Sequence, residues 1–168
     1  MQKKQLAWIL FPVVIVLIAV VTVVLSNFQK ETGIALPGKS GVATVAALAE
    51  AERAASGSGA AGYGVFSNTL TVAAAQAYGM TTTNAAETRL QVIVANAIDC
   101  LKAGRETWQA ELEQDWNPTV DGSANYWLTL HSGLRPQEQT SGLSVGQVRQ
   151  WANDSAAYWL QKALALVE

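Results

Sequence analysis

Residues 6–25 read LAWILFPVVIVLIAVVTVVL, and this stretch decides how the chain is organised. None of its twenty side chains is charged, and fifteen of them are Leu, Ile, Val or Phe. A helix of this length measures about 30 Å, which matches the hydrocarbon core of a bilayer. Each large apolar side chain near its centre contributes about −0.3 to −0.6 kcal/mol to membrane insertion. The stretch therefore predicts one transmembrane helix, over residues 6–28.

The flanking charges predict the orientation of this helix. Lys3 and Lys4 precede it, and basic residues beside a span favour the cytoplasmic side. Residues 1–5 are thus expected in the cytoplasm and the rest of the chain in the periplasm, with the helix in a bacterial inner (cytoplasmic) membrane. A cleaved signal peptide normally has a shorter apolar core of 7–15 residues and a small-residue cleavage site, so an uncleaved signal anchor is favoured. The helix contains no ionisable residue, which an ion path or proton relay needs.

The composition of the remaining chain excludes several classes of function. From residue 40 onward there are seven Lys and Arg against twelve Asp and Glu, a net charge of −5, which disfavours nucleic acid as a partner. The chain has a single cysteine, Cys100, and a single histidine, His131. These exclude an internal disulfide, a His-rich metal site and a default catalytic dyad. We expect a buried thiol, a plain loop histidine, no cofactor and no enzymatic activity.

The pattern of residues 29–168 predicts an all-α domain behind a short linker. Turn signals at residues 32–33 and 37–38 indicate an irregular linker over residues 29–41. Periodicity and end signals then predict two short and two long helices in a helical domain over residues 42–168, at residues 42–55, 67–79, 85–116 and 144–167. The two long helices are expected to pair antiparallel across the loop-rich residues 117–143, where YWLTL is either a helical turn or a short extended piece.

Helix-end signals mark the two long helices. Asn84 with Glu87, and Ser144 with Gln147, have the spacing of capping boxes. Gly104 lies on the apolar face of the first long helix and indicates a close approach or a bend. Acidic residues gather near the end of the same helix, where a solvated face is expected and a docking patch for a basic partner is the alternative: Glu106, Glu111, Glu113 and Asp115.

Glycines at positions 57, 59 and 62 match the letters of the dinucleotide-binding pattern G-x-G-x-x-G. That pattern requires a preceding strand and a helix that opens at the glycines. A helix is expected before this segment and no strand pattern is near, so nucleotide binding is not expected. Residues 56–64 are interpreted as a flexible loop, or as a segment ordered against a partner.

Tryptophan provides the remaining signal for function, because the chain has six and the side chain is enriched at interfaces. Trp8 fits an interfacial membrane anchor, and the C-terminal third is expected to contact partners; the candidate partner-binding residues are Trp8, Trp116, Trp127, Trp151 and Trp159. The leading hypothesis is a non-catalytic accessory subunit that stabilises or bridges other subunits of a larger membrane complex. By analogy of architecture alone, that complex is expected to be photosynthetic or respiratory. The alternative is a membrane-tethered periplasmic binding or sensing module, with a pocket lined by Trp108, Trp127 and Trp159.

Overall fold

The computed structural model describes residues 37–168, and in this part of the chain every regular element is a helix. The elements are α2 (Lys39–Ala55), α3 (Gly59–Tyr78), α4 (Ala85–Glu113), α5 (Ala124–Leu130) and α6 (Val145–Val167). The all-α class is therefore confirmed for these residues. The predicted cytoplasmic tail, transmembrane helix and residues 29–36 of the linker lie outside the described residues. Within residues 37–168, none of the helices is long and apolar enough to span a bilayer.

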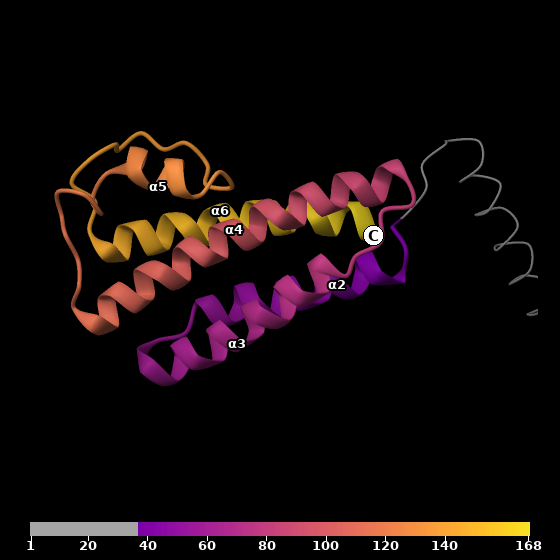
Figure 1. Cartoon of the computed structure of the whole chain (residues 1–168), viewed down its shortest axis with the longest axis horizontal. Helices are drawn as coiled ribbons and strands as arrows, with labels where there is room; N and C mark the ends of the chain where they lie inside the picture. Colours follow the sequence, from indigo (N-terminus) through magenta and orange to yellow (C-terminus); the bar gives the residue numbers. More distant parts are fainter. Residues whose placement is uncertain (1–36) are drawn as a thin grey trace, which may run out of the picture. The chain divides into compact units, whose positions relative to one another are not determined.

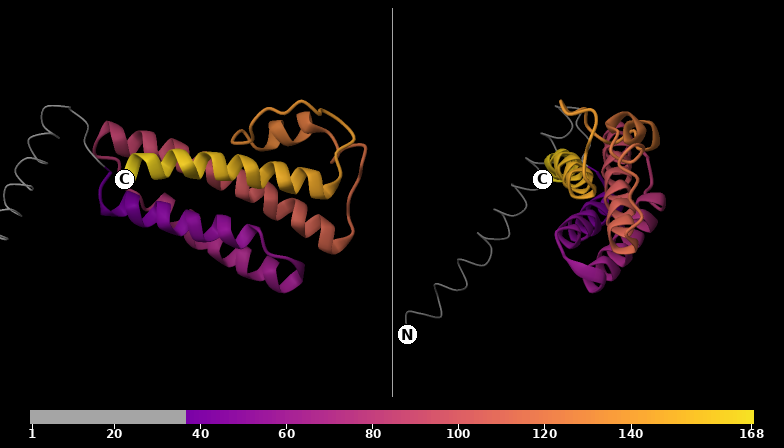
Figure 2. Two further views of the ribbon diagram at one scale, coloured as in Figure 1. Left: turned by 180° about the vertical axis from the view of Figure 1, so that it is seen from behind. Right: turned by 90° about the vertical axis from the view of Figure 1, so that its left-hand side faces the viewer.

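Helices α2, α3, α4 and α6 form an antiparallel bundle, in which each helix runs opposite to the one before it (Figure 1). The pair α4–α6 has the most extensive contact, followed by α2–α3, and α3 and α6 lie on a diagonal (Figure 2). The predicted antiparallel pairing of the two long helices is confirmed. Helix α5 and its flanking loops cover one end of the α4–α6 pair. The start of α2, the 79–84 loop and the C-terminus lie at the opposite end.

Small residues bring α4 and α6 close together. A Cβ atom added to Gly104 would lie 3.0 Å from Asn153 Oδ1 and 3.8 Å from the Cβ of Ala152. Gly104 therefore marks a close approach, one of the two roles expected for it. The predicted apolar face of α4 is also buried, except at Leu112, which is 40% exposed: Leu90, Val94, Ala97, Leu101 and Trp108.

The two predicted caps are present, and one differs in detail. Ser144 and Gln147 form a complete capping box at the start of α6. At the start of α4, Asn84 accepts a hydrogen bond from the Glu87 N–H at 2.9 Å. The Glu87 carboxylate does not accept a hydrogen bond from the Asn84 N–H, as a capping box requires. It accepts hydrogen bonds from the N–H and hydroxyl of Thr83 and from the Gly38 N–H. Glu87 thus joins the segment before α2 to the start of α4.

The first two bundle helices differ from their predictions, since α2 has 17 residues and α3 has 20, so neither is short. Helix α2 begins at Lys39, inside the predicted linker. The predicted flexible loop over residues 56–64 is wrong, because α3 begins at Gly59 and continues through the predicted start at residue 67. A Cβ atom on Gly57 or Gly62 would lie 3.3–3.4 Å from the Trp108 ring. Both glycines therefore leave room for the Trp108 ring, and at Gly62, inside α3, this packing outweighs the low helix propensity of glycine, which costs about 1 kcal/mol.

Candidate functional site

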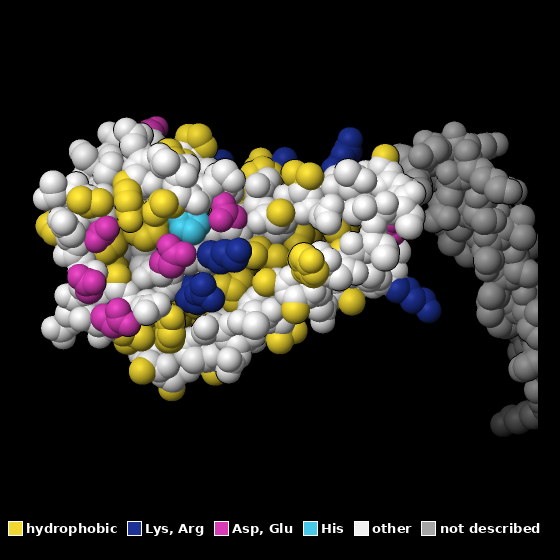
Figure 3. Space-filling model, viewed as in Figure 1, with side chains coloured by type: hydrophobic (Ala, Val, Ile, Leu, Met, Phe, Trp, Pro, Cys, Tyr) yellow, Lys and Arg dark blue, Asp and Glu magenta, His cyan; other side chains and the backbone are white. Residues whose placement is uncertain are grey.

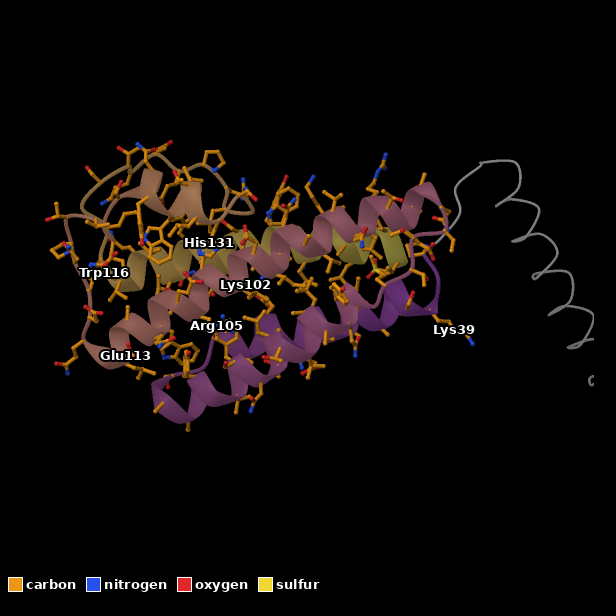
Figure 4. All side chains as sticks on the ribbon, viewed as in Figure 1. Lys39, Lys102, Arg105, Glu113, Trp116 and His131 are labelled. Carbon is orange, nitrogen blue, oxygen red and sulfur yellow. The ribbon has the colours of Figure 1, made fainter. Side chains whose placement is uncertain are left out.

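His131 lies at the end of α5, buried between two carboxylates of α4 (Figure 4). Its Nδ1 is 3.0 Å from Asp99 Oδ1, and its Nε2 is 3.1 Å from Glu106 Oε2. Asp99 and Glu106 are seven residues apart, which is about two helical turns, so both lie on one face of α4. The side chain of His131 is 7% exposed, that of Asp99 28% and that of Glu106 46%.

The charge of the His131 imidazole is set by two opposing effects. Burial lowers the pKa of His131, because it disfavours the imidazolium. The hydrogen bonds and negative charges of Glu106 and Asp99 raise it, and together they outweigh burial, so the pKa of His131 is above its usual value. The two carboxylates therefore favour the imidazolium over the neutral ring.

Asp99 also holds the loop that follows His131. Its Oδ2 accepts a hydrogen bond from the Gly133 N–H at 3.0 Å. Gly133 lies directly against the carbonyl of Asn96, where a Cβ atom would clash with the α4 backbone. The cluster of His131, Asp99, Glu106 and Gly133 thus fastens the α5 region to α4, and it is called the histidine clamp below.

The indoles of three predicted partner-binding residues hold the same loop region. Trp127 donates to the Asp121 carbonyl, Trp151 to the Arg135 carbonyl and Trp159 to the Gly133 carbonyl, each at 2.7 Å. Trp127 and Trp151 are 5% and 8% exposed, and Trp159 is half-buried. Their described contacts are therefore internal to the domain: Trp151 and Trp159 join residues 133–135 to α6, and Trp127 joins α5 to the loop before it.

The two remaining tryptophan candidates are Trp116, which the structure describes, and Trp8, which it does not. Trp116 is half-buried and stacks with Trp127 at 6.4 Å between ring centroids, and Trp127 stacks with His131 at 5.9 Å. Trp8 lies outside the described residues. That these residues bind a partner stays a prediction.

The histidine clamp corrects two sequence-based expectations. His131 is not a plain loop histidine, since it is buried and has two charged partners. The acidic end of α4 is not simply a solvated face, since Glu106 contacts His131 and Glu111 pairs with Arg149 at 2.6 Å. His131 is 25 and 32 residues from its carboxylates. Only the spacing of Asp99 and Glu106 on one helix face was available as a signal before the fold was known.

The chemistry open to the histidine clamp follows from its geometry. Both ring nitrogens are engaged, and the two carboxylates lie at opposite edges of the imidazole, so they do not converge on one point where an ion would sit. Within residues 37–168, no group of three His, Cys, Asp or Glu is placed to hold a metal. Cys100 is fully buried, as expected, and burial raises the pKa of its thiol to about 12. The geometry of the clamp suits it to holding α5 and the loop after it against α4.

The outer face of α3 is the most unusual surface of the described domain. None of the 20 residues of α3 is charged. Only Phe66, Leu70 and Ala73 are buried, whereas Val65 is 58% exposed, Val72 53% and Tyr78 94%. A surface helix normally has polar or charged residues opposite its buried face. The exposed residues of α3 are instead apolar, small or uncharged polar, with Asn68, Thr71 and Gln76 as the exposed polar side chains, so this face has no charge.

A groove of about 430 Å³ lies beside this face, between the second half of α3 and α4. Its walls are mostly apolar, and one basic residue closes one end: Ala74, Ala77, Tyr78, Gln91, Val92, Ala95, Ile98 and Lys102. Apolar side chains gather along this side of the molecule next to basic ones (Figure 3). Lys102 and Arg105 lie on the same face of α4, toward α3 (Figure 4).

A second cleft, of about 300 Å³, lies between the end of α2 and α6 and is mostly polar. Its walls include Glu52, Arg149 and Asp154, and Arg149 already pairs with Glu111. Neither this cleft nor the groove beside α3 is lined by tryptophan.

Comparison with known proteins gives no match: no family model fits the sequence, and neither a curated protein nor a solved structure is significantly similar to the chain.

Proposed function

We propose that this chain is a non-catalytic accessory subunit of a larger membrane complex. Residues 6–25 anchor it in the bilayer, and the helical bundle packs against neighbouring subunits and stabilises or bridges them. Placement of the bundle on the periplasmic side is supported by Lys3 and Lys4 before the apolar stretch. A photosynthetic or respiratory complex is the proposed host, by analogy of architecture.

The observation that carries the proposal is the uncharged outer face of α3. The exposed surface of a helix normally includes charged residues, and α3 has none, although only three of its residues are buried within this chain. Val72 is 53% exposed, so a partner that covers it gains about half of the 1.5–3 kcal/mol of full burial, which is about 1 kcal/mol. Exposed apolar side chains on an uncharged face mark a candidate protein–protein contact.

The tethered sensing module remains the alternative. It requires a pocket walled by Trp108, Trp127 and Trp159. Trp108 is 1% exposed and packs against Phe66 and Tyr63, whereas Trp127 and Trp159 belong to the loop region around residues 117–143. These side chains lie in separate clusters, which favours the accessory-subunit proposal.

A matched pair of substitutions tests the proposal. Ala75 on α3 and Ala165 on α6 are both exposed alanines inside helices, and α3 and α6 are diagonal in the bundle. In the full chain, Ala75→Glu places a charge on the outer face of α3, and Ala165→Glu is the control. After extraction in a mild detergent, Ala75→Glu should shift the chain from a large complex to the free form on a native gel, whereas Ala165→Glu should not. Equal behaviour of the two variants contradicts the role assigned to α3.

A further inference from the structure

The groove between α3 and α4 has the dimensions of a short helix contact. Its α4 wall runs from Gln91 to Lys102. At about 1.5 Å per residue this wall is about 16 Å long, which corresponds to three turns of a helix lying beside it. The wall residue Val92 is 58% exposed and Tyr78 is 94% exposed. A large aromatic ring with so much exposed surface is available to a partner.

The basic end of the groove, at Lys102 and Arg105, lacks the carboxylate partners that neighbouring turns of a helix normally supply. Asp99 and Glu106 are three residues before and four residues after Lys102, the spacings of helical ion pairs. Both of these carboxylates instead contact His131, and Asp99 also accepts from Gly133. The four ion pairs within residues 37–168 include neither Lys102 nor Arg105. The histidine clamp therefore leaves two positive charges beside an apolar groove.

We infer that this groove is the docking site for an amphipathic helix of a partner subunit, with an apolar ridge along Val92 and Tyr78 and an acidic side chain at Lys102 and Arg105. The inference rests on the proposed function and names the chemistry of the partner. The ridge fits the apolar walls, and complementary charge fixes its direction and register, since Lys102 is the one charged residue among the described walls of the groove. A second copy of this chain or a lipid are the competing occupants.

Photo-crosslinking in the native membrane tests the inference with the full chain. p-Benzoylphenylalanine replaces Val92 in the groove, Val72 on the outer face of α3, or Ala165 on α6 as the control, and adducts are identified by peptide mass spectrometry. The expected Val92 adduct is one peptide of another protein, with apolar residues at three- and four-residue spacing and Asp or Glu one or two turns beyond them. Its yield should exceed that at Ala165 at least tenfold.

Charge substitutions in the same experiment test the basic end of the groove. Lys102→Glu combined with Arg105→Glu should lower the Val92 adduct at least tenfold, whereas Lys102→Arg combined with Arg105→Lys should leave it unchanged. An adduct with a second copy, with lipid, or with a peptide without an acidic residue overturns the inference. So does a yield at the control level, or one that charge reversal does not change.

The position at Val72 separates this inference from the proposed function. A protein adduct at Val72 with none at Val92 keeps the accessory subunit and removes the groove as its docking site. Background yield at Val72 as well as at Val92 removes both.

Discussion

Replacement of His131 by phenylalanine tests the histidine clamp most sharply. Phenylalanine keeps a planar ring against Trp127, where the stacked rings are 5.9 Å apart, but lacks both nitrogens. The two hydrogen bonds to Asp99 and Glu106, 3.0 and 3.1 Å long, are lost. A hydrogen bond to a charged group contributes about 1.5–3 kcal/mol when buried, and the partial exposure of both carboxylates reduces this value. We expect a loss of about 2–3 kcal/mol in the free energy of unfolding at pH 6.

The pH dependence of this loss has a definite sign. The pKa of His131 is raised in the folded state, so the clamp stabilises fully below the unfolded value of about 6.5. Its stabilisation falls as the pH rises through the raised folded pKa. The difference between the wild type and His131→Phe should therefore be largest near pH 6 and should shrink toward pH 9.

Urea unfolding of the full chain in detergent, followed by tryptophan fluorescence, measures this difference, because Trp127 lies in the clamp region. Leu130→Phe is the control, since Leu130 is adjacent and 52% exposed, and it should change stability by less than about 0.5 kcal/mol at either pH. A loss for His131→Phe that is independent of pH, or that grows as the pH rises, refutes the reasoning.

Three further substitutions or treatments have definite expected outcomes. Gly133→Ala should destabilise by about 1–3 kcal/mol in the same urea assay, since its Cβ meets the Asn96 carbonyl, whereas Gly146→Ala, which has open space around it, should be tolerated. Glu87→Gln should lower the urea midpoint at neutral pH. Hydrogen bonds from Thr83 and Gly38 lower the pKa of Glu87, so the difference from the wild type should vanish as the pH falls through that lowered pKa. A difference that persists in acid would contradict the role assigned to the Glu87 carboxylate. Cys100 should resist a thiol reagent at pH 8 in the folded chain and react in urea, because it is fully buried and its pKa is about 12; rapid labelling of the folded chain would show that α4 opens there.

Local signals along the chain predict the long helices well. The caps at Asn84 and Ser144 and the apolar face that contains Leu90 and Leu101 are short-range patterns, and the structure confirms each of them. Gly104 also indicated a close approach, because a glycine on an apolar helix face lets a neighbouring helix come near. The caps and the apolar face are predictable because the residues that define them lie within a few positions of one another.

Features that depend on contacts between residues far apart in the sequence could not be predicted from local patterns. The glycines of residues 57–62 indicated a loop, since nothing near them shows that Trp108 fills the space above them. The histidine clamp joins residues 25 and 32 positions apart, across the end of α4 and the loop that follows it, where no pattern within one helix applies. That Trp127, Trp151 and Trp159 bind a partner stays a prediction, and their hydrogen bonds to loop carbonyls could not be predicted, because those acceptors are placed by the fold.

The most direct test of the central claim is the mass of the particle that contains the wild-type chain. The chain itself has a mass of 17.8 kDa. After extraction of the native membrane in a mild detergent, the accessory-subunit proposal predicts that the chain elutes with other subunits in a particle several times heavier than itself. A monodisperse free monomer under the same conditions would contradict it.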